Sequence, residues 1–127
     1  MLMADAVWTV EDHLAQGDER TVALWHRFAS ILEGFGPTTL SVSKTTVTFK
    51  GSRRGFAGAR PTAEALVGYF DLMRELPADR RVRSASRFDR NLVVHHFTVT
   101  DASDLDAEFV GWLEEAYAVG NGAHLRR

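Results

Sequence analysis

The chain contains no cysteine among its 127 residues. This absence excludes a disulfide framework, a thiolate zinc site, an iron–sulfur cluster and a cysteine nucleophile. No apolar run approaches the roughly eighteen residues that a membrane-spanning helix needs, and Met1 to Val10 has neither the basic start nor the apolar stretch of a secretory signal. No repeat, low-complexity tract or linker divides the chain. We therefore expect one soluble, cytoplasmic domain over residues 1–127, ordered from about 8 to 120, with no membrane partner.

Sequence motifs for common catalytic and metal sites are also missing. No Gly-x-Ser-x-Gly nucleophile elbow occurs, and the glycine-containing stretch 51–58 lacks the Gly-Lys-Ser/Thr ending of a phosphate loop. Asp101, Asp104 and Asp106 do not have the spacing of an EF-hand, and the histidines lack the spacing of metal ligands. We expect neither a metal nor a cofactor.

Charge is sorted along the chain. The segment from about Pro37 to Thr98 holds eleven lysines and arginines against five carboxylates, whereas the segments on either side each hold two arginines against six carboxylates. A near-neutral net charge of −2 therefore conceals a basic middle. Basic residues concentrated on one element create a local positive field, so an anionic partner is indicated although no reaction is.

Three helices are predicted. Apolar residues at spacings of three and four indicate a helix from about Asp18 to Glu33. Before it, Thr9 and Asp12 have the spacing of a capping box and predict a short helix. Ser103 is expected to cap the third helix. The apolar stripe of that helix consists of Leu105, Phe109, Trp112, Leu113 and Ala116.

Between these helices, β-branched and aromatic residues predict strands near 38–43, 45–50, 55–60, 81–88 and 92–100. The stretch 66–72 fits both a helical face and strand alternation. A strand is preferred there because Gly68 would weaken a helix by roughly 1 kcal/mol relative to alanine. The expected architecture is α+β: an N-terminal helical pair, an antiparallel meander sheet of about five to six strands, and a long C-terminal helix packed on the sheet.

The order of several segments resembles a known bacterial family. The segments are Ser41-Val-Ser-Lys-Thr-Thr-Val-Thr-Phe-Lys, Arg54-Gly-Phe-Ala-Gly, Leu66-Val-Gly-Tyr-Phe-Asp-Leu, His95-His-Phe-Thr-Val, Asp104-Leu-Asp and Trp112-Leu-Glu-Glu-Ala-Tyr. From about Val10 to Gly120 the chain resembles the domain of unknown function 5655. The resemblance implies two helices, an antiparallel sheet and a further helix, with a strand at 66–72. It implies no activity, cofactor or catalytic residue.

His95 and His96 are neighbours in a predicted strand, so their side chains must point to opposite faces and cannot bind one metal together. His95 shares its face with Phe97 and Val99, which predicts a packed, hydrogen-bonded histidine. His96 is the candidate general acid or base, or a ligand to a bound molecule.

Arg81, Arg83 and Arg87 alternate along one predicted strand and are expected to share a face. Two interpretations stay open. The face is either a solvated surface charged against edge pairing, or a surface for anions or nucleic acid with Tyr69 or Phe56 as a stacking ring. A pI of about 6.2 argues against a dedicated nucleic-acid binder. Basic residues at neighbouring strand ends that would extend this face are Lys44, Lys50, Arg53, Arg54 and Arg90.

Three functions remain as hypotheses. The first is a binding or interaction module whose basic sheet face or pocket takes an anionic small molecule or a protein partner. The second is a small enzyme with His96 as general acid or base and Tyr69 or Lys44 nearby, and the third is a nucleic-acid-associated accessory domain. Self-association through an edge strand or the apolar N-terminal residues leaves monomer and homodimer open. The candidate ligand-binding residues are Lys44, Arg53, Arg54, Tyr69, Arg83 and His96.

Overall fold

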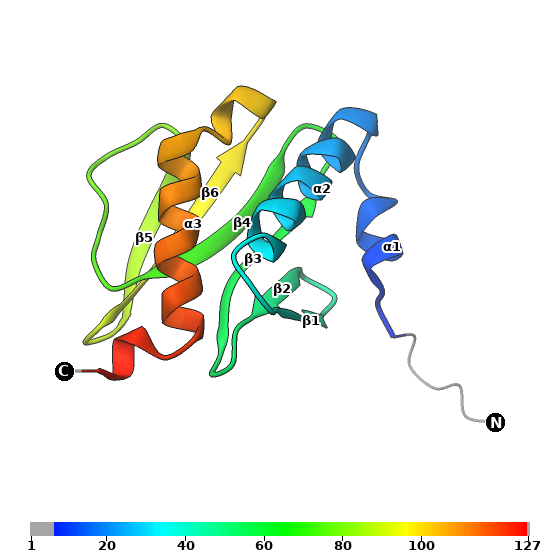
Figure 1. The fold of residues 1–127 in the computed structure, drawn as a ribbon. Coiled ribbons are helices and arrows are strands. Elements are labelled where there is room, and N and C mark those ends of the chain that lie inside the picture. The colour runs from blue at the N-terminus through cyan, green and yellow to red at the C-terminus, as the bar shows by residue number, and fades with distance from the viewer. Residues whose placement is uncertain (1–6, 127) are drawn as a thin grey trace.

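The computed structural model describes residues 7–126, and it has two helices, six strands and a third long helix in that order along the chain (Figure 1). The α+β prediction is confirmed. The expectation about a secretory signal falls largely on residues 1–6, which lie outside the described residues. Within 7–126, no helix has the length and apolar character needed to cross a membrane.

Both N-terminal helices begin with reciprocal side-chain caps. At the start of α1 (Val10–Leu14), the Asp12 N–H donates to the Thr9 hydroxyl at 3.1 Å and the Thr9 N–H donates to the Asp12 carboxylate at 2.9 Å. This is the capping box that the sequence predicts. Asp18 and Thr21 cap α2 (Glu19–Glu33) in the same manner.

The third helix, α3 (Ala107–Gly120), begins later than predicted. Its cap is Asp106, whose carboxylate accepts the Phe109 N–H at 2.9 Å. Ser103 lies instead in a separate 3-10 turn, Ala102–Asp104, where Asp101 accepts the Ser103 N–H. The prediction that Ser103 caps the helix is therefore wrong, because Asp101 starts its own turn and the chain leaves helical geometry before α3 begins.

The strands form one antiparallel sheet in the order β1-β2-β3-β4-β6-β5. They are β1 (Thr39–Val42), β2 (Val47–Lys50), β3 (Gly55–Pro61), β4 (Leu66–Leu72), β5 (Val82–Asp89) and β6 (Leu92–Val99). The strand at 66–72 is confirmed. The last two strands depart from a simple meander, since β6 lies beside β4 and β5 forms the edge. Their side chains explain the order: most β6 residues are buried, as an interior strand requires, whereas β5 is largely exposed.

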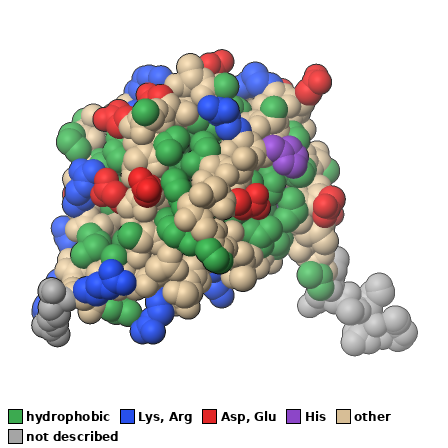
Figure 2. Space-filling model, viewed as in Figure 1, with side chains coloured by type: hydrophobic (Ala, Val, Ile, Leu, Met, Phe, Trp, Pro, Cys, Tyr) green, Lys and Arg blue, Asp and Glu red, His purple; other side chains and the backbone are tan. Residues whose placement is uncertain are grey.

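Helices α2 and α3 cover one face of the sheet, and the core lies between these two layers (Figure 1). Its centre is a cluster of four buried rings, Phe28, Phe70, Phe97 and Phe109. On the helix-covered side, acidic and basic side chains are interspersed with apolar ones (Figure 2). We call the opposite side of the sheet the outer face. A row of register partners crosses it from β2 to β5: Thr48, Gly58, Tyr69, His96 and Ser84.

Candidate functional site

The three arginines predicted to share one strand face are separated in the structure. Arg81 is buried and lies just before β5. A register shift between Val82 and Ser84 makes Arg83 the extra residue of a β-bulge, next to the pair Ser84 and His96 on the outer face. Arg87 pairs with the buried Val93 and so lies on the other face. The prediction of a shared face is wrong because the bulge interrupts the period of two.

Arg81 is part of the core rather than of a surface. Its side chain is 5% exposed and donates to the carboxylates of Asp79, Asp106 and Glu108 at 2.8–2.9 Å. Hydrogen bonding to Asp79 first, and then to Asp106, raises the pKa of Arg81. Its guanidinium also lies over the ring of Trp112, 4.8 Å from the centroid. Arg81 therefore joins the start of β5 to α3 and is not available to a ligand.

The outer face carries a cavity of about 350 Å³, which we call the outer-face cavity. Its walls come from the approach to β2 and from β3, β4, β5 and β6, so residues far apart in the sequence meet there. Three of the six candidate ligand-binding residues line it: Tyr69, Arg83 and His96. The full lining is Thr45, Thr46, Arg60, Val67, Gly68, Tyr69, Arg83 and His96.

Tyr69 and His96 are direct neighbours across the β4–β6 ladder. The Tyr69 hydroxyl donates to the hydroxyl of Thr48 at 3.3 Å. Burial raises the pKa of Tyr69, so its phenol keeps its proton and stays a hydrogen-bond donor at neutral pH. His96 is exposed at the cavity wall. Tyr69 and His96 thus line the cavity as neighbours.

Arg60 is the charged cavity residue that the sequence did not single out. It lies two residues after Gly58 on β3 and pairs with Val67, which is on the outer face with Tyr69. Strand alternation from Gly58 would have placed it there. Within residues 7–126, neither Arg60 nor Arg83 has a side-chain hydrogen bond or a carboxylate partner.

The remaining candidate residues lie elsewhere. Lys44 is exposed in the β1–β2 turn and does not line the cavity. Arg53 is exposed near the end of α3, where its N–H donates to the Gly120 carbonyl at 2.8 Å. Arg54 forms an ion pair with Asp71 at 3.2 Å. Phe56, considered as a stacking ring, is fully buried, so that suggestion is wrong.

Asp71 is a buried carboxylate on the outer face, two residues along β4 from Tyr69. One oxygen, Oδ2, accepts from Arg54, whereas Oδ1 is buried and has no partner within the described residues. Burial raises the pKa of Asp71 to about 6 even though the Arg54 charge acts in the opposite direction. No pattern in the sequence distinguishes this aspartate from the exposed ones.

His95 is buried on the helix-covered face of the sheet, and the prediction of a packed, hydrogen-bonded histidine is confirmed. Its Nε2 accepts the Leu76 N–H at 3.1 Å, so the ring proton is on Nδ1, which donates to the Val93 carbonyl at 3.1 Å. The ring stacks on Phe70 with 5.3 Å between centroids. Burial lowers the pKa of His95, which favours the neutral form that these contacts require.

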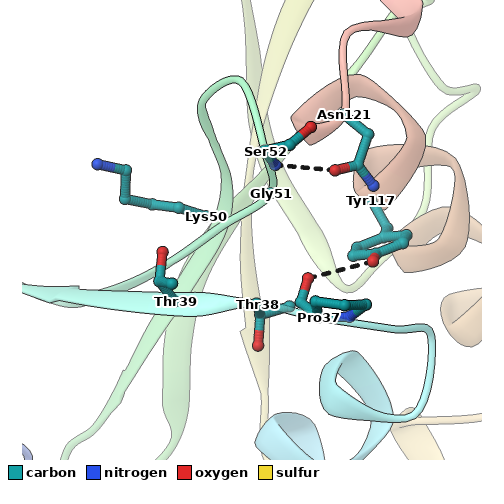
Figure 3. Close-up of a pocket in the computed structure, with 8 residues that line it drawn as sticks. All are labelled: Pro37, Thr38, Thr39, Lys50, Gly51, Ser52, Tyr117 and Asn121. Carbon is teal, nitrogen blue, oxygen red and sulfur yellow. Dashed lines mark hydrogen bonds between the residues drawn. The ribbon is translucent and has the colours of Figure 1, made fainter.

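A second cavity of about 240 Å³ lies where the end of α3 meets the chain before β1 and the β2–β3 turn (Figure 3). Tyr117 donates to the Pro37 carbonyl at 3.1 Å, and the Ser52 N–H donates to the Asn121 side-chain oxygen at 2.8 Å. The one charged lining residue, Lys50, directs its ammonium away from Tyr117 and Asn121 (Figure 3). These contacts serve to join α3 to the sheet, so the outer-face cavity is the stronger candidate site.

In the part of the chain that the structure describes, no group of three or more histidine and carboxylate side chains could hold a metal ion. A family model described as a domain of unknown function (DUF5655) matches residues 10–120. No curated protein and no solved structure matches the chain.

Proposed function

The chain belongs to the DUF5655 family of domains of unknown function, and from the geometry of the outer-face cavity we propose that it binds a small anionic ligand there. One observation carries the proposal: Arg60 and Arg83 both line the cavity without a carboxylate partner among the described residues. A guanidinium offers a planar fork of donors that matches carboxylate and phosphate groups. Two such groups at one cavity favour an anion.

Four of the other arginines provide a contrast. Arg54, Arg74, Arg80 and Arg81 each pair with a carboxylate. Arg60 and Arg83, which pair with no carboxylate among the described residues, are on strands that flank β4 and β6 on either side, with one cavity between them. This distribution supports localised recognition of a small ligand more than a continuous basic track for nucleic acid.

The size and lining of the cavity suit a small molecule. Its volume of about 350 Å³ is within the usual range for ligand pockets. Val67 and the Tyr69 ring supply apolar surface, while His96 and the hydroxyl of Thr45 supply polar contacts. The expected ligand therefore combines an anionic group, held by the arginines, with a less polar body.

Calorimetric titration with inorganic phosphate, sulfate, citrate and a nucleoside monophosphate at low and high salt tests the proposal. We expect at least one of these anions to bind at low salt and to bind more weakly at high salt. The double variant Arg60→Gln/Arg83→Gln should lose this binding. The matched control is Arg27→Gln/Arg53→Gln, which removes the same charge from exposed positions outside the cavity. Absence of binding by all four anions, or equal loss in both double variants, would overturn the proposal.

A second candidate function is an enzyme in which His96 is the general acid or base. It is favoured by the direct pairing of His96 with Tyr69 beside two arginines that would hold an anionic substrate. Lys44 has no part in it, since it does not line the cavity. For any anion that the titrations identify, His96→Gln should abolish turnover while it leaves most of the binding. Turnover that persists in this variant would contradict the enzyme.

A further inference from the structure

A buried carboxylate lies beside the proposed ligand cavity. The side chain of Asp71 is 3% exposed, yet within the described part of the chain only one of its two oxygens has a partner, a single nitrogen of Arg54 at 3.2 Å. Buried polar atoms are normally satisfied, because an unpaired one costs roughly 1–3 kcal/mol. An ionised carboxylate with an unpaired oxygen at this depth calls for an explanation.

The surroundings of Asp71 couple it to the cavity. On the outer face, the charged or titratable groups around it are Arg54 from the segment before β3, Tyr69 on β4 and His96 on β6. The β5 residue in the same row is Ser86, which carries no charge. Tyr69 lines the cavity and lies two residues from Asp71 along β4, so a charge on Asp71 acts through space on a ligand there.

We propose that Asp71 is a proton-controlled counter-charge of the outer-face cavity: ionised, it neutralises Arg54 and weakens anion binding, and protonated, it frees that positive charge and strengthens binding. This inference rests on the proposed function of the cavity. The contact between Arg54 and Asp71 supports the proposal, because Arg54 is itself about one-third exposed and, among residues 7–126, touches only this one carboxylate. The Arg54 guanidinium also lies 5.7 Å from the ring centroid of the exposed Phe88, so it remains on the outer face when the pair opens.

The direction of the pH effect follows from linkage. Burial raises the pKa of Asp71 to about 6, so the proton is gained as the pH falls through about 6. Anion affinity should therefore rise over the same interval. By reciprocity, a bound anion must raise the pKa of Asp71 further. One unit charge near the cavity, screened by protein and water, changes the affinity for an anion by roughly threefold to tenfold.

Sulfate is the probe for the test, because its charge does not change between about pH 5 and pH 8. Its dissociation constant is measured calorimetrically on both sides of pH 6 for the natural chain, Asp71→Asn, His96→Gln and the exposed control Glu64→Gln. His96 is included because its imidazole lines the cavity. At the higher pH we expect Asp71→Asn to bind sulfate more tightly than the natural chain does. The ratio of the dissociation constants measured at the two pH values should also be smaller for this variant. His96→Gln should retain the part of the ratio that Asp71 supplies.

A second measurement does not depend on any variant. The carboxyl carbon resonance of Asp71 in the natural chain gives its titration midpoint by nuclear magnetic resonance, and added sulfate should move that midpoint to higher pH. Equal pH ratios in Asp71→Asn and the natural chain, or a midpoint that sulfate leaves in place, would overturn the inference while the cavity still binds anions. Absence of sulfate binding at every pH, together with no binding of the other anions, would instead remove the proposed function itself.

Discussion

The guanidinium of Arg81 lies over the indole ring of Trp112, with 4.8 Å between the guanidinium carbon and the ring centroid. The same group donates to three carboxylates: Asp79, just before β5, and Asp106 and Glu108, at the start of α3. The planar fork bonds at its edge while its face stacks on an aromatic ring, a combination that only arginine provides. One residue thereby connects the edge of the sheet to the helix that covers it.

Removing this connection should destabilise the fold. We expect Arg81→Ala to lower the free energy of unfolding by about 2–4 kcal/mol, because it removes the stack on Trp112 and the donor to the buried Asp104 carbonyl, 2.9 Å away. Asp106 and Glu108 are partly solvated, which limits the loss. Arg81→Lys should recover only part of that loss, because an ammonium neither forks nor stacks. Urea unfolding gives the values. Arg83→Ala, two residues along and without a side-chain partner among residues 7–126, is the control and should change stability by less than about 0.5 kcal/mol.

The fold was largely predictable from the sequence because its signals are local. Capping residues mark where α1 and α2 begin, and β-branched residues mark the strands. The exchange of β5 and β6 was missed because strand order depends on total burial, which no single residue reveals. The prediction for Arg81 is wrong for a related reason. A basic residue in an alternating strand resembles a surface residue, and the sequence does not show that Asp106 and Glu108, at the start of α3, lie beside it.

The candidate site was only partly predictable. The sequence offers Tyr69 or Lys44 as a neighbour of His96, and the pairing of β4 with β6 decides for Tyr69. Arg83 reached the cavity through a bulge that alternation does not predict, and the same bulge sent Arg87 to the other face. Asp71 became distinctive only through burial, which arises from packing of distant segments and has no signature in its own neighbourhood.

The adjacent histidines offer a matched pair of variants. His95→Gln should destabilise the protein by about 1–3 kcal/mol, because it removes the stack on Phe70 and disturbs the acceptor of the buried Leu76 N–H. His96→Gln, one residue away on the exposed outer face, should change stability by less than about 0.5 kcal/mol. Urea unfolding at neutral pH compares them. Similar losses in both variants would contradict the opposite environments of the two side chains.

The lowered pKa of His95 predicts how the stability of the fold depends on pH. Burial lowers the pKa of His95 in the folded state below its unfolded value, so its stabilising contribution is present above the unfolded value near pH 6.5 and is lost as the pH falls through the folded one. Nitrogen-15 spectra should show the proton on Nδ1 at neutral pH. A proton on Nε2 instead would be inconsistent with the bond from the Leu76 N–H.

Two glycines should respond in opposite ways to alanine. An added Cβ at Gly68 would lie 2.1 Å from the Gly58 carbonyl oxygen and 2.8 Å from the Phe97 ring, so β3 and β4 would have to separate. We expect Gly68→Ala to cost about 2 kcal/mol or more. At Gly111, within α3, no described residue outside the local helix backbone lies within 4 Å of the added atom, and Gly111→Ala should stabilise the protein by about 0.5–1 kcal/mol. Thermal unfolding of the two variants distinguishes these outcomes.

The buried Asp71 makes a stability prediction that requires no ligand. Because burial raises its pKa from 3.8 to about 6, its contribution to stability is complete below about pH 4 and is lost as the pH rises through about 6. Asp71→Asn has no such ionisation. The free energy of unfolding of the variant minus that of the natural chain should therefore increase across this interval by on the order of 2–3 kcal/mol.

Urea unfolding at several pH values between about 4 and 7 measures this difference. The exposed carboxylate of Glu64 supplies the control, since Glu64→Gln should show a nearly constant difference over the same interval. A difference for Asp71→Asn that shrinks as the pH rises would mean that attraction to Arg54 outweighs burial. In that case Asp71 would stay ionised down to acidic pH, and it could not control the charge beside the cavity near neutrality.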